Sequence, residues 1–326
     1  MMRDPAPTFH AARFRAIGAE HEILCSEESA RPIAVAIAED LLAELDSAAS
    51  RFHVSELDSL NRAALHGPVT AEISPLLAEV LRAALWAAAD TGGLNDPTLG
   101  AGLLAAGYDV DIDAVRSRAP HEWAAWVPPV PSERSSGWQN VELRGRRLTL
   151  PAGTLLDVGS IGKAFAADAI AARCDSQLPG AFVVNCGGDI ALAGLAPSSG
   201  VPLGIMDAHD RLVDAVELSA GGMATSSTQL RRWQRDGRSL HHIIDPRSGE
   251  PALPVWHTAT VTAASAVAAN AASTAAIVLG DAAPDWLAGR DVHALLVGAD
   301  RRTAIRWPTT AVPNRCDGVT TEEAAA

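Results

Sequence analysis

Lys163 is the only lysine of the chain, and it stands where a glycine-containing loop enters a predicted helix. The loop, Asp157–Lys163, reads DVGSIGK, and the periodicity that follows predicts a helix over Ile161–Ala172. Free backbone N–H groups and the positive end of a helix attract phosphate, so this segment suits an anion site. It is not a Walker A loop, which would need a glycine in place of Asp157 and a Ser or Thr in place of Ala164. The alternative is an ordinary helix cap with a surface lysine.

Two other segments place polar residues beside tight turns. NCGGDI, over residues 185–190, follows a predicted buried strand, and its two glycines permit either close approach of a ligand or simply a sharp turn. SLHHIIDPRSG, over residues 239–249, has His242 and Asp245 on either side of two isoleucines, followed by a strong turn signal. A His–Asp pair can do acid–base chemistry or contact a phosphate, whereas a lone histidine near a turn is more often structural.

Asn270 and Thr274 lie four residues apart in a helix predicted over Ala264–Leu279, and therefore on one helical face. An amide oxygen and a hydroxyl there suit a hard cation, which prefers oxygen ligands. No carboxylate accompanies them, so hydrogen bonding between helices is the simpler interpretation. The loop GGLNDPTLG, over residues 92–100, is rich in turn residues and predicts no chemistry by itself.

The rest of the chain must position these segments. Recurrence of apolar residues at three and four predicts helices over Pro32–Ala49 and Ile73–Ala89, and a short helix over Ala119–Trp126. Strands are predicted over residues 14–25, 181–186, 202–206, 213–218, 240–244 and 258–261, with a hairpin over 140–150. Strands and helices do not alternate regularly, which favours an α+β fold of one domain. We expect that domain over residues 13–311, after an extension of residues 1–12 and before a polar, disordered tail of residues 312–326.

Composition excludes several classes of protein. The 326 residues include 26 basic and 39 acidic side chains, a net charge of −13, without the basic clusters by which proteins bind nucleic acid. No secretory signal is visible in MMRDPAPTFHAARF, so a cytoplasmic location is expected. The uncharged stretch Thr258–Gly280 is long enough to span a bilayer, but its Thr, Ser and Ala content predicts a strand and helix of a soluble protein instead. The four cysteines lack CxxC spacing and are predicted to be free thiols.

Taken in order along the chain, the motifs resemble those of the ApbE family, the FAD:protein FMN transferases. DVGSIGKAFAADAI is similar to the family's D-L-G-G-I-A-K-G-Y-A-x-D, and VVNCGGDIALAG to V-N-x-G-G-D-I. ATSS…HHIIDPRSGEP resembles A-T-S-G…H-I-I-D-P-x-T-G-x-P, and VTAASAVAANAASTAAIVLG resembles the last helix, V-T-V-x-A-P-x-A-x-x-A-D-A-x-x-T. SRFHVSELDSLN and GGLNDPTLGAGLLAAGY resemble two upstream segments, S-x-Y-R-P-D-S-E-x-S-x-L-N and G-A-F-D-P-T-V-G-P-L.

This resemblance implies an α+β domain of mixed and antiparallel sheets packed with helices, of the T-fold type. It implies FAD as substrate with a divalent cation, usually Mg²⁺. Members of the family move the FMN half of FAD to a Thr or Ser hydroxyl of an acceptor protein and release AMP, and some hydrolyse FAD instead. The acceptor implied is another polypeptide with a segment like D-x-x-[ST]-G-A-T.

The resemblance also implies roles for individual residues. Asp157 and Lys163 match positions that contact FAD, and His242 matches the histidine near the reacting phosphates, as a base or a phosphate ligand. Ser160 and Thr274 match the cation site. The remaining cofactor positions are an aromatic residue near the flavin and three loop residues, which correspond to Phe52, Leu94, Asn95 and Asp96.

Three positions depart from the family pattern. Asn270 replaces the aspartate of the last helix, which removes a negative charge from the cation site. Asn95 replaces the aromatic residue of A-F-D, and Ile17 replaces an early methionine. The changed cation site leaves two alternatives open beside the transferase: a non-catalytic FAD-binding protein and a metal-dependent FAD pyrophosphatase.

Overall fold

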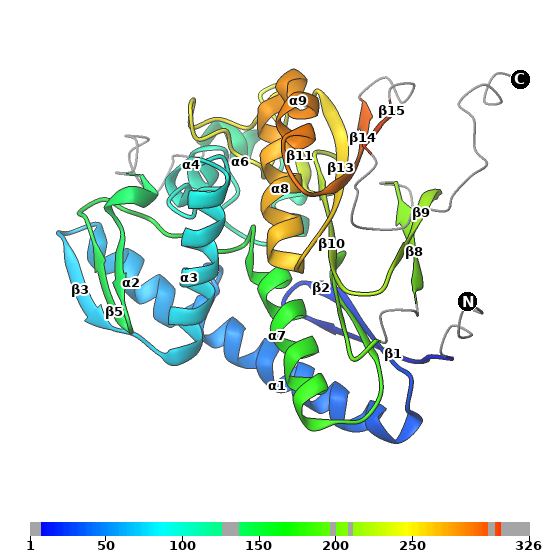
Figure 1. Cartoon of the computed structure of the whole chain (residues 1–326). Helices are drawn as coiled ribbons and strands as arrows, with labels where there is room; N and C mark the ends of the chain where they lie inside the picture. Colours follow the sequence, from blue (N-terminus) through cyan, green and yellow to red (C-terminus); the bar gives the residue numbers. More distant parts are fainter. Residues whose placement is uncertain (1–7, 126–136, 196–199, 208–210, 299–303, 308–326) are drawn as a thin grey trace, which may run out of the picture.

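One antiparallel sheet of eight strands is the framework of the protein (Figure 1). The computed structural model describes residues 8–125, 137–195, 200–207, 211–298 and 304–307. The order of the strands in the sheet is β1-β2-β6-β7-β10-β13-β14-β15. Their bounds are β1 His10–Ala16, β2 Ala19–Cys25, β6 Phe182–Cys186, β7 Asp189–Ala193, β10 Gly221–Ser227, β13 Trp256–Ala263, β14 His293–Gly298 and β15 Ala304–Trp307.

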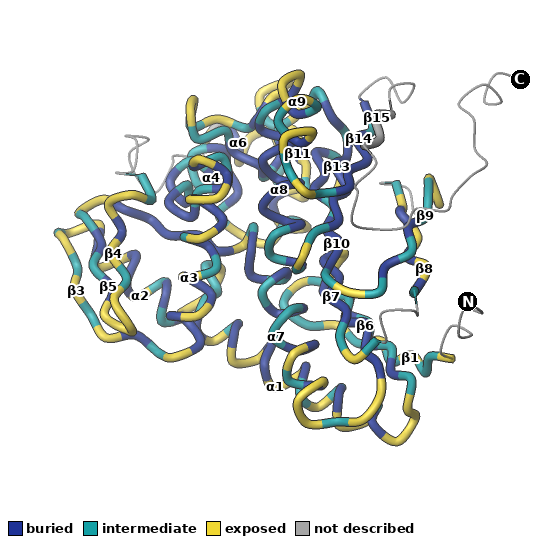
Figure 2. Tube along the Cα trace, in the orientation of Figure 1, coloured by how far each residue is buried: buried dark blue, intermediate teal, exposed yellow. Residues whose placement is uncertain are grey.

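Three helices cover one face of this sheet (Figure 1). They are α1 (Arg31–Ala49), which packs on β1 and β2, α7 (Gly162–Gln177), on β6 and β7, and α8 (Ala266–Leu279), on β10 and β13. Most of α8 is buried, as the dark blue tube in Figure 2 shows, because its small Ala, Ser and Thr side chains let it lie close to the strands.

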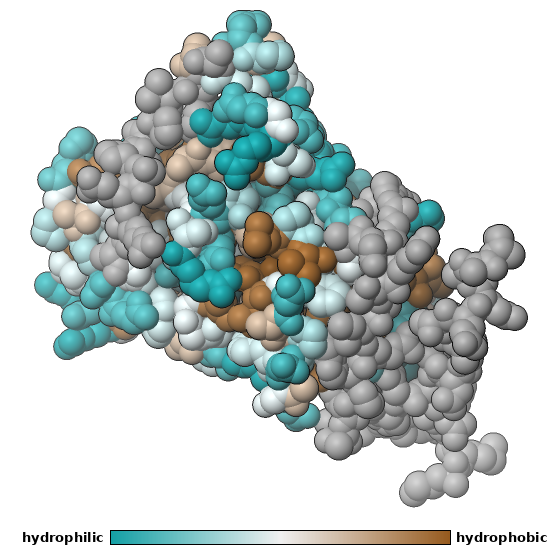
Figure 3. Space-filling view, turned by 90° about the horizontal axis from the view of Figure 1, so that it is seen from above, coloured by the Kyte–Doolittle hydropathy of each residue, from teal (hydrophilic) through white to brown (hydrophobic). Residues whose placement is uncertain are grey.

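The other face of the sheet is covered by a separate hairpin of β8 (Val201–Met206) and β9 (Leu212–Leu218). Side chains of β8 alternate between buried and exposed, so that Val201, Leu203 and Ile205 face the sheet. Seen from above in Figure 3, apolar residues gather near the middle of the upper face, among hydrophilic neighbours.

Smaller elements surround this core. A three-stranded sheet in the order β3-β5-β4 lies beside α2 and α3, and β11 and β12 form a second hairpin. Their bounds, with those of the remaining short helices, are β3 Val69–Glu72, β4 Glu142–Arg144, β5 Arg147–Leu150, β11 Arg232–Arg235, β12 Arg238–His241, α2 Glu56–Ala64, α3 Pro75–Asp90, α4 Gly100–Ala105, α5 Ile112–Ser117, α6 Pro120–Ala125 and α9 Ala283–Ala288.

The structure confirms the α+β class, and most of the helices and strands predicted from periodicity occur. Ser74 caps α3 by accepting the N–H of Leu77 at 3.3 Å, and Pro75 occupies the first position of the helix. The hairpin predicted at residues 140–150 is formed by β4 and β5.

Some predicted bounds are wrong. The single strand expected over residues 14–25 is the hairpin β1–β2, because Ile17 and Gly18 turn the chain with φ of 41° and 68°. Helix α7 continues to Gln177, and the strand predicted at 240–244 ends at His241. Strand β1 begins at His10, within the expected N-terminal extension. The domain bounds 13–311 stay a prediction, and the tail of residues 312–326 lies outside the described residues.

Three of the four cysteines and most of the long uncharged stretch near the C-terminal end of the fold are buried. Cys25, Cys174 and Cys186 are buried free thiols, whereas Cys316 is not among the described residues. The helical stretch Ala266–Ala288 is long and apolar enough to cross a membrane, yet 72% of its most apolar part is buried inside the protein, as in a core helix.

Candidate active site

A cavity of about 340 Å³ opens where the ends of several elements meet, and we call it the central cavity. All ten residues singled out from the sequence line it: Phe52, Leu94, Asn95, Asp96, Asp157, Ser160, Lys163, His242, Asn270 and Thr274. They come from the α1–α2 connection, the loop after α3, the N-terminal side of α7, the segment after β12, and α8. The fold therefore brings the predicted residues together, although proximity alone assigns none of them a role.

A second cavity of about 380 Å³, here the side cavity, adjoins the first and shares part of its lining. The shared residues include Arg51, Tyr108, Asp157, Lys163 and Arg231, which therefore lie at the junction of the two cavities. A third, larger cavity of about 520 Å³ lies between α4 and the turn at 246–251, and of the ten residues it touches only Asp96.

Asp157 is held on both of its carboxylate oxygens. Oδ1 accepts the backbone N–H of Gly159 at 2.7 Å, and Oδ2 forms an ion pair with Nε of Arg51 at 2.5 Å. The Arg51 guanidinium lies over the rings of Phe52 and Tyr108, at 4.3 and 4.5 Å from their centroids. Sequence reasoning missed Arg51, because only the fold joins it to Asp157, far along the chain.

Phe52 supplies an aromatic surface at the edge of both cavities. Its side chain is 47% exposed, and its ring meets Tyr108 edge-on at 5.8 Å. One face is covered by Arg51, so an aromatic ligand has the remaining exposed surface to pack against.

The β6–β7 turn shapes the position of Lys163. Gly187 and Gly188 form a two-residue hairpin turn with φ of 61° and 97°, which glycine adopts without strain. A Cβ at Gly187 would come within 2.9 Å of Cδ of Lys163, so the glycine also leaves room for the lysine stem. Of the two alternatives that the sequence presented, the sharp turn is formed, and the group that approaches Gly187 closely is the Lys163 side chain.

Asp189, at the start of β7, is the acidic neighbour of Lys163 that the sequence analysis treated only as part of a turn. Burial raises the pKa of Asp189, and the charge of Lys163 acts in the opposite direction. Burial also lowers the pKa of Lys163, aided by Arg231 and opposed by Asp189. The ammonium of Lys163 makes no hydrogen bond or ion pair with any residue that the structure describes.

His242 is half-buried, and its Nδ1 atom is fully buried without a hydrogen-bond partner among the described residues. Burial, together with the positive charge of Arg231, holds the pKa of His242 well below its ordinary value. The imidazole is therefore neutral at neutral pH in the free protein, and it can accept a proton.

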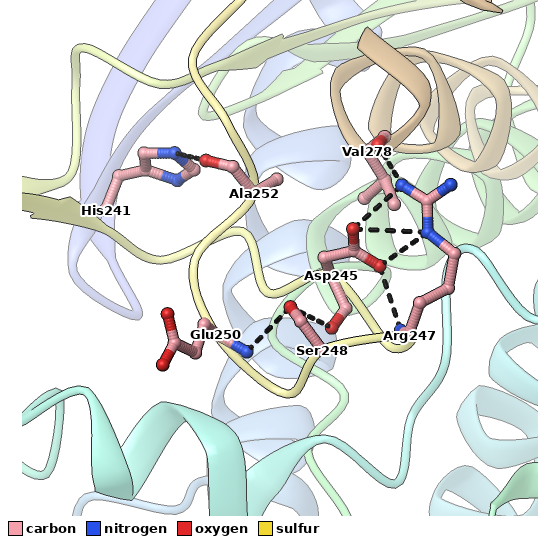
Figure 4. A network of polar contacts seen from close by, with 7 residues as sticks. All are labelled: His241, Asp245, Arg247, Ser248, Glu250, Ala252 and Val278. Carbon is pink, nitrogen blue, oxygen red and sulfur yellow. Dashed lines mark hydrogen bonds and ion pairs between the residues drawn. The ribbon is translucent and has the colours of Figure 1, made fainter.

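The predicted His–Asp pair is not formed, which corrects one interpretation of the HHIIDPRSG segment. Figure 4 shows that Asp245 is bound by Arg247, whose Nη2 donates to Asp245 at 2.8 Å and to the carbonyl of Val278 at 2.9 Å. Nε2 of the neighbouring His241 contacts the carbonyl of Ala252 at 2.9 Å. Both contacts fasten the turn to its surroundings, and His242 faces the central cavity without a carboxylate partner of this kind.

Asn270 and Asp189 lie side by side in the wall of the central cavity. Nδ2 of Asn270 donates to Oδ1 of Asp189 at 3.1 Å, and Oδ1 of Asn270 is buried with no partner in the described part of the chain. Thr274 shares a hydrogen bond with Oγ of Ser226 at 2.9 Å. A buried oxygen that the protein leaves unbonded indicates a ligand, and an amide oxygen beside a hydroxyl fits a hard cation.

Ser160 is bound differently from the other two predicted cation ligands. Its hydroxyl donates to Oδ1 of Asn95 at 3.0 Å, while Nδ2 of Asn95 is buried without a partner among the described residues. Asn95, which replaces the aromatic residue of the family pattern, therefore positions Ser160. Within the described residues no three His, Cys, Asp or Glu side chains gather as a metal cluster. A cation bound here would therefore also need oxygen atoms from a bound anionic molecule.

Comparison with known sequences gives a family match across most of the chain. The sequence model of the ApbE family matches residues 17–296. A protein of Treponema pallidum named FAD:protein FMN transferase is 31% identical over 248 residues, which cover 69% of this chain and 65% of the relative. A protein of the same name from Salmonella typhimurium is 25% identical over 219 residues, which cover 64% of this chain and 60% of the relative. The chain thus spans less than two thirds of these curated relatives.

Comparison with solved structures shows the same fold. The ApbE protein of Thermotoga maritima superposes with a TM-score of 0.74 at 26% identity, covering 92% of this chain and 97% of the other. The apo form of the flavinyl transferase ApbE of Pseudomonas stutzeri superposes with a TM-score of 0.75 at 22% identity, covering 93% and 95% of the two chains.

Proposed function

The chain belongs to the ApbE family, and from this premise we propose that it transfers the FMN part of FAD to a hydroxyl of an acceptor protein. In this reaction a Thr or Ser oxygen of the acceptor bonds to the phosphorus of the FMN half. The bond from that phosphorus to the bridging oxygen breaks, AMP leaves with the bridging oxygen, and the hydroxyl proton is released.

The observation that carries the proposal is the central cavity, whose lining contains every position that the family resemblance assigns to FAD and the cation. Around it the described chain leaves several polar atoms buried without hydrogen-bond partners, among them Nδ1 of His242, Oδ1 of Asn270 and Nδ2 of Asn95. Native proteins rarely leave such atoms unbonded, so the cavity is built for a polar ligand. Its ammonium and guanidinium groups favour a ligand that carries negative charge.

His242 is suited to take the hydroxyl proton. The imidazole is neutral in the free protein, because burial and Arg231 lower its pKa, and a neutral imidazole accepts a proton readily. The negative charge of bound phosphates would offset Arg231 and raise this pKa toward the working pH. These arguments favour a general base over a positively charged phosphate ligand.

A divalent cation would be held by Oδ1 of Asn270 and the hydroxyl of Thr274, with Asp189 nearby and phosphate oxygens of FAD completing the set. Bound there, Mg²⁺ would neutralise charge that develops on the leaving phosphate. Asp157 is already bound by Arg51 and Gly159, and its role in this proposal is to hold the α7 entry segment beside the ligand.

The test mixes the purified protein with FAD and Mg²⁺, with and without an acceptor protein that carries a D-x-x-[ST]-G-A-T segment. We expect AMP release that depends on the acceptor, together with a mass increase of the acceptor equal to one FMN. Replacing the acceptor's Ser or Thr by Val or Ala should abolish the mass increase. His242→Asn should lower the rate while FAD still binds.

Asn270 favours a second candidate, a protein that binds FAD without turning it over, because the family's aspartate is absent from the cation site. FAD binding without AMP release at any Mg²⁺ concentration, with several acceptors, would support this candidate. AMP release that is indifferent to the acceptor would instead support an FAD pyrophosphatase.

A further inference from the structure

Arg231 lies beside His242 although eleven positions separate the two in the chain. The hairpin β11–β12 pairs Arg232 with His241, and the next pair outward is Arg231 with His242, joined by the bond from N of His242 to the carbonyl of Arg231 at 3.2 Å. Residues paired in this way carry their side chains on the same face of a hairpin, with Cβ atoms roughly 5 Å apart. Arg231 and His242 therefore approach the cavity from the same side.

Neighbouring residues confirm the direction in which that face points. Trp233, two residues along β11, is buried and stacks on Tyr108 with the ring centroids 5.4 Å apart. Arg232, between them, is exposed, as alternation along a strand requires. The face that carries Arg231 and Trp233 is thus the one turned toward the two cavities, and Arg231 lines both of them.

Charged side chains of the central cavity fall into two groups. Four have direct partners: Arg51 and Asp157 pair with each other, Asp96 accepts from Thr98, and Asp189 accepts from Asn270. The side chains of Lys163 and Arg231 have no hydrogen bond or ion pair with the described residues. Both act electrostatically on His242 and Asp189, so they lie close to the same groups.

The side chains of Lys163 and Arg231 also line the same part of the site. Lys163 and Arg231 both lie at the junction of the central and side cavities. A dinucleotide such as FAD carries its negative charge in the middle, between two ring systems. The junction is where a diphosphate would lie if the two ends occupied the two cavities.

We propose that Arg231 is a diphosphate-binding residue of this site, acting with Lys163 at the junction of the cavities. The proposal deepens the proposed function, on which it rests, because it names the residue that recognises the charged middle of FAD. Guanidinium groups are well suited to this task, because their planar array of N–H donors matches two phosphate oxygens at once.

The experiment measures dissociation constants of FAD, ADP and riboflavin for the wild type, Arg231→Gln, Arg231→Lys and Arg232→Gln, in the presence of Mg²⁺. Flavin fluorescence reports FAD and riboflavin, and calorimetry reports ADP. Arg232→Gln is the matched control, since it removes a neighbouring guanidinium on the opposite, exposed face of the same strand. Circular dichroism confirms that each variant is folded.

We expect Arg231→Gln to weaken FAD and ADP binding by about ten- to hundred-fold, the value of a lost charge-assisted hydrogen bond. Riboflavin, which has no phosphate, should bind to this variant as to the wild type. Arg231→Lys should recover part of the loss, and Arg232→Gln should bind all three ligands normally.

The proposal is overturned if Arg231→Gln binds FAD and ADP as tightly as the wild type. It is also overturned if riboflavin binding falls by the same factor, since Arg231 would then act through packing alone. Wild-type protein that binds FAD but never releases AMP would contradict the proposed function and leave the role of Arg231 to be decided by these constants. Wild-type protein that binds neither FAD nor ADP would overturn both.

Discussion

Asp189 accepts the side-chain amide of Asn270 at 3.1 Å, and this bond fixes which end of the amide faces the central cavity. The amide nitrogen of Asn270 is the donor in this bond, and a carboxylate oxygen of Asp189 is the acceptor. The oxygen of Asn270 is thereby turned to the other side, where it has no partner among the described residues. The chain has lost a carboxylate at this position relative to the family pattern, but it keeps an oriented oxygen.

Asn270→Asp would place a second carboxylate against Asp189 in a buried place. Asp189 is the acidic neighbour that matters here, because it already accepts a hydrogen bond from Asn270 at 3.1 Å. Without a cation the two acids repel, so we expect the variant to be less stable than the wild type. With Mg²⁺ both can ionise around the ion, so the variant should gain more thermal stability from Mg²⁺ and reach half-maximal FAD turnover at a lower Mg²⁺ concentration.

Thermal melting of both proteins in EDTA and across a Mg²⁺ titration measures this effect independently of turnover. Asn270→Ala is the control, because it removes the oxygen without adding charge and should abolish the Mg²⁺-dependent gain. Equal gains for the wild type, Asn270→Asp and Asn270→Ala would remove Asn270 from the cation site. FAD turnover that persists in EDTA would refute the cation requirement itself.

Lys163→Ala should weaken FAD binding more than riboflavin binding. The ammonium lies at the junction of the cavities without a partner in the described chain, so its replacement costs contacts that only a phosphate-bearing ligand makes. We expect about a ten- to hundred-fold rise in the dissociation constant of FAD. Lys163→Arg should keep part of the affinity. If a fluorescence titration gives Lys163→Ala the same dissociation constant for FAD as the wild type, the lysine does not contact the ligand and only packs against Gly187 and its neighbours.

His242 predicts a specific dependence of stability on pH. Burial and Arg231 lower its pKa in the folded protein, so below about pH 6.5 the unfolded chain takes up a proton that the folded chain does not. Unfolding free energy should therefore fall as the pH drops from 6.5 toward the folded pKa, with a slope of about 1.4 kcal/mol per pH unit for one such histidine.

His21 and His241, whose pKa values burial also lowers, contribute in the same direction. His242→Asn should accordingly flatten the pH dependence in part and leave a remainder. Denaturant unfolding of both proteins between pH 5 and pH 8 gives the comparison, with the exposed His66 changed to Asn as the control. Parallel curves for the wild type and His242→Asn would contradict the low pKa assigned to His242.

Sequence patterns predicted those site residues that lie close together in the chain. Lys163 and Asp157 share one loop, and Asn270 and Thr274 share one helical face, so their grouping could be recognised before the fold was known. Arg51 and Arg231 carry no local signal, because each joins the cavity through a contact made by the fold, an ion pair in one case and a hairpin register in the other.

The same distinction applies to the secondary structure. Helices such as α1 and α8 were predicted because their apolar or small residues recur with helical spacing. The β1–β2 hairpin was read as one strand because its turn uses Ile17 at a positive φ, which a β-branched residue seldom adopts. Asp245 pairs with Arg247 and not with His242, and Arg247 is also held by the carbonyl of Val278 near the end of α8. No local sequence pattern reveals that distant carbonyl.

Asp168 should prove important for presenting the cation residues, although it touches neither cavity. From α7 its carboxylate accepts the backbone N–H groups of Ala266 and Val267 at 2.8 and 2.9 Å, and so caps the helix that carries Asn270 and Thr274. Ser265 caps the same end through the N–H of Ala268 at 3.1 Å.

Asp168→Ala would leave two N–H groups at the interface of α7 and α8 without acceptors, which we expect to cost about 2 kcal/mol of unfolding free energy. Asp168→Asn retains one acceptor oxygen and should cost less, and Asp175→Ala, an exposed acid on the same helix, should cost nothing measurable. Because the first turn of α8 sets where its later turns lie, Asp168→Ala should also raise the Mg²⁺ concentration needed to stabilise the FAD complex. Denaturant unfolding and Mg²⁺ titration of the three variants test both parts, and an Asp168→Ala protein as stable as Asp175→Ala would show that Ser265 alone suffices to cap α8.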